Sequence, residues 1–100
     1  MYLLHGKLEA KAGQEKRLED ILLTAAQSAP TMAGCHLYVV GKKDGEPRSV
    51  YITEIWDNKA AHDNSLKNED TRALIQQAIP LLATQPERGD ELKILGGFGI

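Results

Sequence analysis

The chain has one cysteine, Cys35, among its 100 residues. A single cysteine cannot form an intramolecular disulfide, and no Cys-x-x-Cys pair or cysteine and histidine cluster stands at the spacing of a zinc site. His5 and His36 fall on separate predicted strands, with no partner at ligand spacing. We therefore expect no metal site and a reducing, cytoplasmic location.

The sequence also lacks a long apolar run and an excess of charge of one sign. No stretch approaches ~18 consecutive apolar residues, and the first residues lack a basic segment followed by an apolar one, so we expect neither membrane insertion nor secretion. The net charge is -2, and residues of both signs are mixed along the chain. Because no basic stripe is present, we expect no nucleic acid and no membrane among its partners.

Length and the absence of a linker predict one domain over residues 1–100. Alternation and helical spacing then predict the elements of this domain. The first half has a strand at 2–11, a helix at 15–29 ended by Pro30, and hairpin strands at 35–40 and 49–56. A second helix follows in two parts: the first is capped by Asp57 or Asn58, and the second begins after Asn68 and is bent or shortened at Pro80. The last element is a strand at 90–95. This order, βαββαβ, predicts a four-stranded antiparallel sheet with its helices on one face.

Both faces of the two hairpin strands are apolar. Leu37 and Val39 alternate with Tyr38 and Val40, and Ile52 and Trp56 alternate with Tyr51 and Ile55. Helices cover only one face of such a sheet, and a short domain buries only about two-thirds of its unfolded surface, so the other face needs a cover. We expect that cover to be a second copy of the chain. The alternative is that Tyr38, Val40 and Tyr51 are tolerated on a wet face.

The segment Glu54-Ile55-Trp56-Asp57-Asn58-Lys59-Ala60-Ala61-His62 resembles the strand-to-helix signature of the antibiotic biosynthesis monooxygenase family. In that family E-x-W ends the third strand and A-H follows on the next helix. Similar motifs elsewhere extend the resemblance over nearly the whole chain: Gly6-Lys7, Ala12-Gly13, Gly34-Cys35 and Pro80-Leu81-Leu82. The resemblance implies a ferredoxin-like α+β fold that pairs face to face as a dimeric α+β barrel, with a small pocket between sheet and helices in each subunit.

Members of this family carry several activities. Some oxidise polyphenols or quinols with molecular oxygen and without metal, flavin or other prosthetic group, whereas others degrade haem or isomerise small ketonic compounds. The positions that correspond to the asparagine and histidine of haem-degrading relatives hold Gly6 and Leu66, so haem degradation is not expected. An RNA-binding role is not expected either, because residues 50–54 lack the basic and aromatic pattern of that surface.

Three residues are our catalytic candidates: His62, Trp56 and Glu54. The end of the predicted strand and the following helix bring Trp56 and His62 to one pocket mouth, and Glu54 shares the strand face of Trp56. We expect His62 to accept a proton, Trp56 to form the pocket, and Glu54 to bond a helix start or an arginine. The plainer interpretation makes Trp56 a core residue and His62 a solvated polar residue.

A phenol substrate sets a requirement on the pocket. Transfer of its proton (pKa about 10) to a histidine (about 6.5) is uphill by about 5 kcal/mol, so the pocket must stabilise the anion. The expected donors are Trp56 Nε1–H, Arg72 and backbone N–H groups, and the expected apolar wall for an aromatic ring is Tyr38, Ile52 and Leu74.

Two positions depart from the family pattern. Ile52 stands where some polyketide-oxidising members have an asparagine, and Phe98 stands where relatives commonly have a histidine in Gly-Gly-His-Gly. We include Phe98 among the substrate-binding candidates. The leading hypothesis is a cofactor-independent monooxygenase that uses molecular oxygen on a small quinol or polyphenol. The alternatives are an isomerase or epimerase of ketonic compounds and a non-catalytic dimer that binds a small aromatic.

Overall fold

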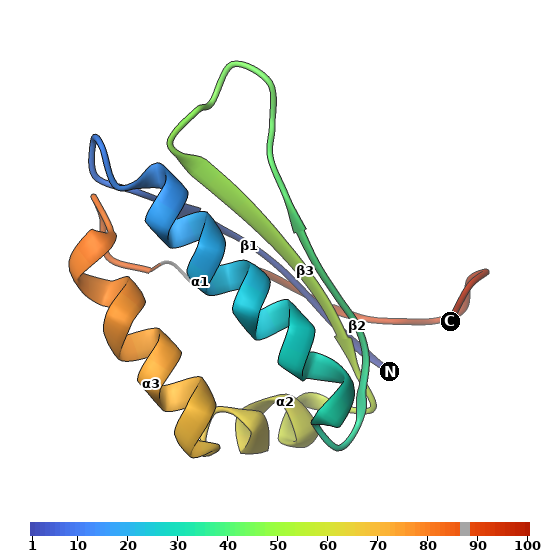
Figure 1. The fold of residues 1–100 in the computed structure, drawn as a ribbon. Coiled ribbons are helices and arrows are strands. Elements are labelled where there is room, and N and C mark those ends of the chain that lie inside the picture. The colour runs from blue at the N-terminus through green and yellow to red at the C-terminus, as the bar shows by residue number, and fades with distance from the viewer. Residues whose placement is uncertain (87–88) are drawn as a thin grey trace.

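The computed structural model describes residues 1–86 and 89–100. Four strands form one antiparallel sheet in the order β2-β3-β1-β4, and the helices lie on one of its faces (Figure 1). The expected ferredoxin-like α+β fold is confirmed. In chain order the elements are β1 (Tyr2–Glu9), α1 (Glu15–Ser28), η1 (Ala29–Thr31), β2 (Cys35–Gly41), β3 (Ser49–Trp56), α2 (Lys59–Ser65), α3 (Glu69–Ala78), η2 (Ile79–Leu81) and β4 (Asp90–Lys93).

Local signals in the sequence explain where the helices begin and end. Asn58 and Asn68 cap α2 and α3, because each side-chain oxygen accepts a hydrogen bond from the backbone N–H three residues further on. The cap of α2 is therefore Asn58 rather than Asp57. Pro30 and Pro80 lie in the short 3₁₀ turns η1 and η2 that follow α1 and α3. A proline has no N–H to continue an α-helix, so both helices end where the sequence predicts.

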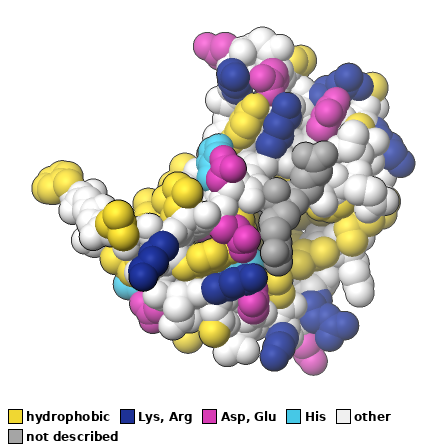
Figure 2. All heavy atoms as spheres, turned by 180° about the vertical axis from the view of Figure 1, so that it is seen from behind, with side chains coloured by type: hydrophobic (Ala, Val, Ile, Leu, Met, Phe, Trp, Pro, Cys, Tyr) yellow, Lys and Arg dark blue, Asp and Glu magenta, His cyan; other side chains and the backbone are white. Residues whose placement is uncertain are grey.

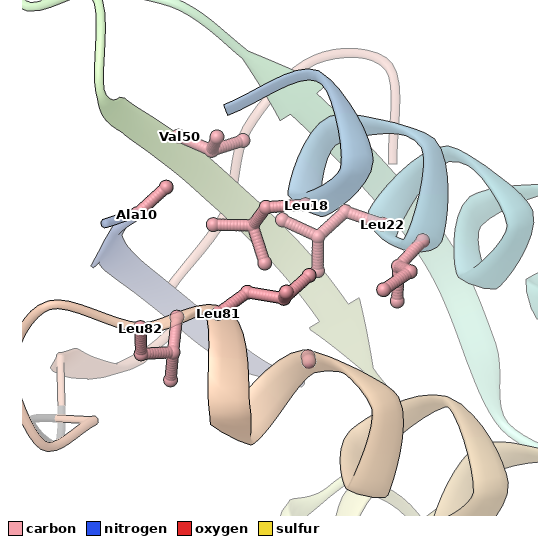
Figure 3. Close-up of a cluster of buried hydrophobic side chains, with 8 residues drawn as sticks. Ala10, Leu18, Leu22, Val50, Leu81 and Leu82 are labelled. Carbon is pink, nitrogen blue, oxygen red and sulfur yellow. The ribbon is translucent and has the colours of Figure 1, made fainter. Parts of the chain in front are cut away.

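The core lies between the sheet and the helices at the end where η2 meets β1. Leu18 and Leu22 of α1 point toward the chain around η2 and toward Val50 of β3 (Figure 3). Leu18 is fully buried, and Val50 is 1% exposed. Burial of each such side chain contributes about 1.5–3 kcal/mol, which holds α1 and the end of α3 on the sheet.

Strand register decides which side chains face the helices. Tyr38 pairs with Glu54 and Val40 with Ile52, on the same face as Trp56. Tyr38 and Val40 therefore lie on the side of the sheet that α1 and α3 cover. The alternative interpretation, which placed them on a solvent-exposed face, is wrong for these two residues. The two hairpin strands also differ in their place in the sheet, because β3 is a central strand and β2 is an edge strand.

The opposite face carries an apolar row across all four strands. Leu37 pairs with Ile55, Ile55 with Leu3, and Leu3 with Leu92. We call these four residues the outer row. No helix among the described residues covers it (Figure 1). Exposure along the row is uneven, because Leu92 is 55% exposed whereas Ile55 is only 6% exposed.

The chain continues past β4 as an extended arm. The last strand is shorter than the predicted 90–95, since β4 spans only Asp90–Lys93. The arm projects from the body and ends in hydrophobic side chains (Figure 2). Leu95 and Phe98 on this arm are almost wholly exposed, at 95% and 104%.

Candidate functional site

A cavity of about 370 Å³ lies between the helix-covered face of the sheet and the three helices. Its volume falls within the range of small-molecule sites. Most of its lining is apolar, with Leu8, Ile21, Leu22, Ala25, Ala29, Met32, Leu66, Leu74, Ile75, Ala78, Ile79, Leu82 and Pro86. The polar lining residues are Ser28, Tyr38, Glu54, Trp56, His62, Ser65 and Thr71. Among the described residues, Glu54 and His62 are the lining groups that can carry a charge near neutral pH.

Glu54, Trp56 and His62 meet at one end of the cavity, and we call them the polar corner. Trp56 Nε1–H donates to Glu54 Oε1 at 3.1 Å. His62 Nε2 lies 4.0 Å from the same carboxylate oxygen. The His62 ring stands edge-on to the Trp56 ring, with centroids 5.8 Å apart and planes at 78°. Residues of β3 and α2 thus converge on one point.

The local fold explains this convergence. Glu54 and Trp56 are two residues apart on β3, so their side chains leave the same face of the sheet. The Asn58 cap starts α2 immediately after β3, and His62 lies one helical turn beyond it. A short connection joins β3, which carries Glu54 and Trp56, to α2, which carries His62. Because the connection is short, the three side chains stay close together.

His62 Nδ1 lies 3.1 Å from Asp63 Oδ1. An ionised carboxylate can only accept, so we assign the proton of neutral His62 to Nδ1. The lone pair then sits on Nε2, the nitrogen that faces Glu54. A neutral His62 in this tautomer is a proton acceptor within the polar corner.

Burial raises the pKa of the Glu54 carboxyl, while the Trp56 hydrogen bond and the His62 charge lower it in part. The side chains of Glu54 and His62 are each only 13% exposed. Glu54 therefore keeps its proton to a higher pH than an exposed glutamate does. Where Glu54 is ionised, a protonated His62 can pair with it across the 4.0 Å between Nε2 and Oε1.

The structure brings together five of the eight predicted site residues: Tyr38, Glu54, Trp56, His62 and Leu74 all line the cavity. Ile52 is not among the lining residues, and its side chain packs against the core cluster of the helix-covered face.

The predicted anion donors are placed differently from expectation. Arg72 is exposed on α3 and is not among the lining residues. Trp56 does line the cavity, but its N–H is directed to Glu54. Glu54 accordingly bonds to Trp56, and not to a helix start or an arginine as expected. Phe98 lies on the exposed arm and outside this chain's cavity.

Sequence reasoning missed two neighbours of His62. The ring of Tyr2 lies 5.9 Å from the His62 ring, because β1 pairs Tyr2 with Trp56 in register. Alternation along the first strand does not supply this register, so it could not place Tyr2 beside Trp56. Asp63 was missed because it is exposed and adjacent in sequence, features shared by many surface aspartates.

Gly34 positions the helix that carries His62. Its φ is +83°, and its carbonyl accepts the Asp57 N–H at 2.8 Å. A Cβ at this position would stand 2.8 Å from Ala61 Cβ and 3.1 Å from Asp57 Oδ2. The loop before β2 therefore packs directly on the start of α2, with no room for a side chain.

Gly34→Ala is expected to lower the free energy of unfolding by about 2–4 kcal/mol, since backbone strain and overpacking add. Gly13→Ala is the matched control, because Gly13 has the same φ of +83° and no atom near its Cβ position. Its expected cost is about 1–2 kcal/mol. Urea unfolding of both variants measures the difference. Equal losses would mean that contact with Ala61 does not restrict this position.

Two further kinds of site are expected to be absent. The described residues contain no group of three or more His, Cys, Asp or Glu side chains that could hold a metal ion. None of their helices has the length and apolar content needed to cross a membrane.

Comparisons with known proteins agree with the fold and with the strand-to-helix signature. The family model described as antibiotic biosynthesis monooxygenase matches residues 1–77. A solved protein from Chloroflexus aurantiacus J-10-fl, provisionally assigned as an antibiotic biosynthesis monooxygenase, is 36% identical with a TM-score of 0.86, over 99% of this chain and 97% of that one. A protein from Deinococcus radiodurans with the same provisional assignment is 28% identical with a TM-score of 0.85, over 100% and 98% of the two chains.

More distant structures share the fold alone. One from Nitrosomonas europaea has a TM-score of 0.88 at 9% identity and covers 96% of this chain and 100% of that one. Among curated proteins no match is found.

Proposed function

Because the chain belongs to the antibiotic biosynthesis monooxygenase family, we propose that it is a monooxygenase that oxidises a small quinol or polyphenol with molecular oxygen. The proposal includes that it needs no metal, flavin or other cofactor. One observation carries it: a proton acceptor, His62 Nε2, stands at the polar corner of a cavity whose lining is otherwise mostly apolar. A ring that is apolar apart from its hydroxyl groups suits such a space.

The proposed reaction balances without an added reductant. His62 takes the proton of a ring hydroxyl, and the anion gives one electron to oxygen. The resulting radical pair combines at the adjacent ring carbon to form a peroxide. Loss of that carbon's hydrogen as a proton and cleavage of the O–O bond then leave a new carbonyl on the ring. The distal oxygen departs as water, so a hydroquinone becomes a hydroxyquinone and the substrate supplies all the electrons.

The 4.0 Å gap between His62 Nε2 and Glu54 Oε1 suits the reacting hydroxyl. An oxygen atom can lie about 2.8 Å from both atoms and donate to one of them. Proton transfer to His62 then creates an imidazolium beside the Glu54 carboxylate. Two unit charges 4 Å apart attract by roughly 4 kcal/mol at an effective dielectric constant of about 20. The same carboxylate repels the new phenolate, so a hydrogen-bond donor to the phenolate must supply much of the ~5 kcal/mol by which proton transfer from a phenol to histidine is uphill.

Oxygen uptake tests this proposal. Protein treated with a chelator is incubated with a panel of hydroquinones and catechols in an oxygen electrode, and product is identified by mass. We expect uptake of one molecule of oxygen per hydroxyquinone formed, with no effect of the chelator. An isomerase built on the same base would consume no oxygen. Absence of uptake with every member of the panel would contradict the proposal.

We also propose that the protein works as a homodimer in which two outer rows pack against each other. The row runs across every strand, so two copies related by a two-fold axis can bury it reciprocally. The arm leaves β4 at the edge of the same sheet and carries three exposed apolar side chains, of which Leu95 and Phe98 are the most exposed. Packing of the arm on the second copy would remove these side chains from water, which contributes about 25 cal/mol per Å² of apolar surface.

A further inference from the structure

Tyr38 has a polar group that the proposed chemistry does not yet use. Its side chain lines the cavity, and strand register places it directly opposite Glu54 on the helix-covered face. Residues paired in this way have Cβ atoms about 4.5–5.5 Å apart. Tyr38 thus enters the cavity beside the polar corner, from the edge strand β2.

The Tyr38 hydroxyl has no hydrogen-bond partner within the described part of the chain. Yet no described side-chain oxygen or nitrogen that is closed off from solvent lacks a partner. The hydroxyl is therefore open to water or to a ligand, although burial raises the pKa of the phenol. It remains protonated at neutral pH and can donate.

Three other donors around the cavity are engaged, while the Thr71 hydroxyl lies on α3 rather than on the strand beside Glu54. Trp56 Nε1–H donates to Glu54. The hydroxyls of Ser28 and Ser65 donate to backbone carbonyls of their own helices. A substrate anion at the polar corner is repelled by an ionised Glu54 and needs a donor, since an unpaired buried oxyanion is costly.

We propose, on the basis of the function proposed above, that the Tyr38 hydroxyl donates a hydrogen bond to the phenolate oxygen of the substrate at the polar corner. The ligand class is accordingly a phenol bound as its anion. Tyr38 is then more than the apolar wall that the sequence predicts, because its ring flanks the substrate and its O–H carries the selectivity for the charged form.

Binding of para-nitrophenol tests this role without turnover, because its absorbance distinguishes phenol from phenolate. We expect Tyr38→Phe to weaken binding of the phenolate by about 10- to 100-fold, the usual effect of one hydrogen bond to a charged group. The bound probe should also ionise at a higher pH in the variant. Nitrobenzene, which has the same ring and no hydroxyl, should bind equally to both proteins.

Tyr51→Phe is the matched control, because Tyr51 lies on the opposite face of the sheet and donates to Glu46 at 2.8 Å. It should leave binding of both probes unchanged. Equal weakening of both probes by Tyr38→Phe would assign Tyr38 a packing role only and overturn the proposal. So would an unchanged phenolate affinity, or a wild-type protein that binds no phenolate. Selective loss of phenolate in a protein that consumes no oxygen would uphold the donor and reject the monooxygenase.

Discussion

His62→Ala is expected to lower quinol-dependent oxygen uptake by about 10²- to 10⁴-fold, the usual contribution of a positioned general base. His62 Nε2 is the proton acceptor of the polar corner, and the nearby carboxylate of Glu54 stabilises the imidazolium that forms. Without the imidazole, the hydroxyl proton has only water or the weakly basic Glu54 to receive it. Oxygen electrode traces at saturating quinol measure the loss directly.

His36→Ala is the control for this substitution. His36 is also a histidine hydrogen-bonded to an aspartate, Asp57, but it is exposed and does not line the cavity. We expect it to keep activity within about twofold of the wild type. Thermal melting of both variants should show folded protein. Retention of more than a tenth of the activity by His62→Ala would exclude His62 as the base.

Leu92→Lys is expected to convert the proposed homodimer to a monomer. In a dimer that buries the outer row, the new ammonium group would lose its hydration without gaining an ion-pair partner in the apolar row. A buried unpaired charge costs several kcal/mol, so the dissociation constant should rise by at least about a hundredfold. Because Leu92 is 55% exposed in the single chain, the subunit itself should fold normally. Light scattering after size-exclusion chromatography over a concentration series gives the mass.

Leu23→Lys makes the same chemical change on α1, where the leucine is 47% exposed. It is expected to leave the mass of the wild-type protein unchanged, since α1 lies on the other side of the sheet (Figure 1). A monomeric mass for the wild-type protein at micromolar concentration would contradict the dimer proposal. So would a Leu92→Lys variant that dimerises as tightly as Leu23→Lys.

Much of the fold could be predicted from residue pattern, because the decisive signals are local. Asn58 and Asn68 cap helices through their own side chains, and Pro30 and Pro80 end helices through their own missing N–H groups. Trp56 and His62 could be paired for the same reason, since a strand end followed at once by a capped helix leaves little freedom between them.

The hydrogen-bond donors to the substrate anion could not be predicted, because the position of each depends on how elements distant in sequence pack together. Arg72 lies on the correct helix but turns away from the cavity, and helical spacing alone does not say which face α3 presents to the sheet. Tyr38 is predicted as part of the apolar wall, but its position opposite Glu54 follows only from the pairing of β2 with β3. A shift of one residue in that pairing would have placed it on the outer face.

By itself the sequence determined the order of strands and helices, the family, and the meeting of Glu54, Trp56 and His62, because these follow from side-chain period and short-range chain geometry. Only the tertiary structure decided that Trp56 is bonded to Glu54, that Arg72 is outside the cavity and that Tyr38 lines the cavity opposite Glu54. Those outcomes depend on strand register and helix rotation, which are set by the packing of residues far apart in the chain.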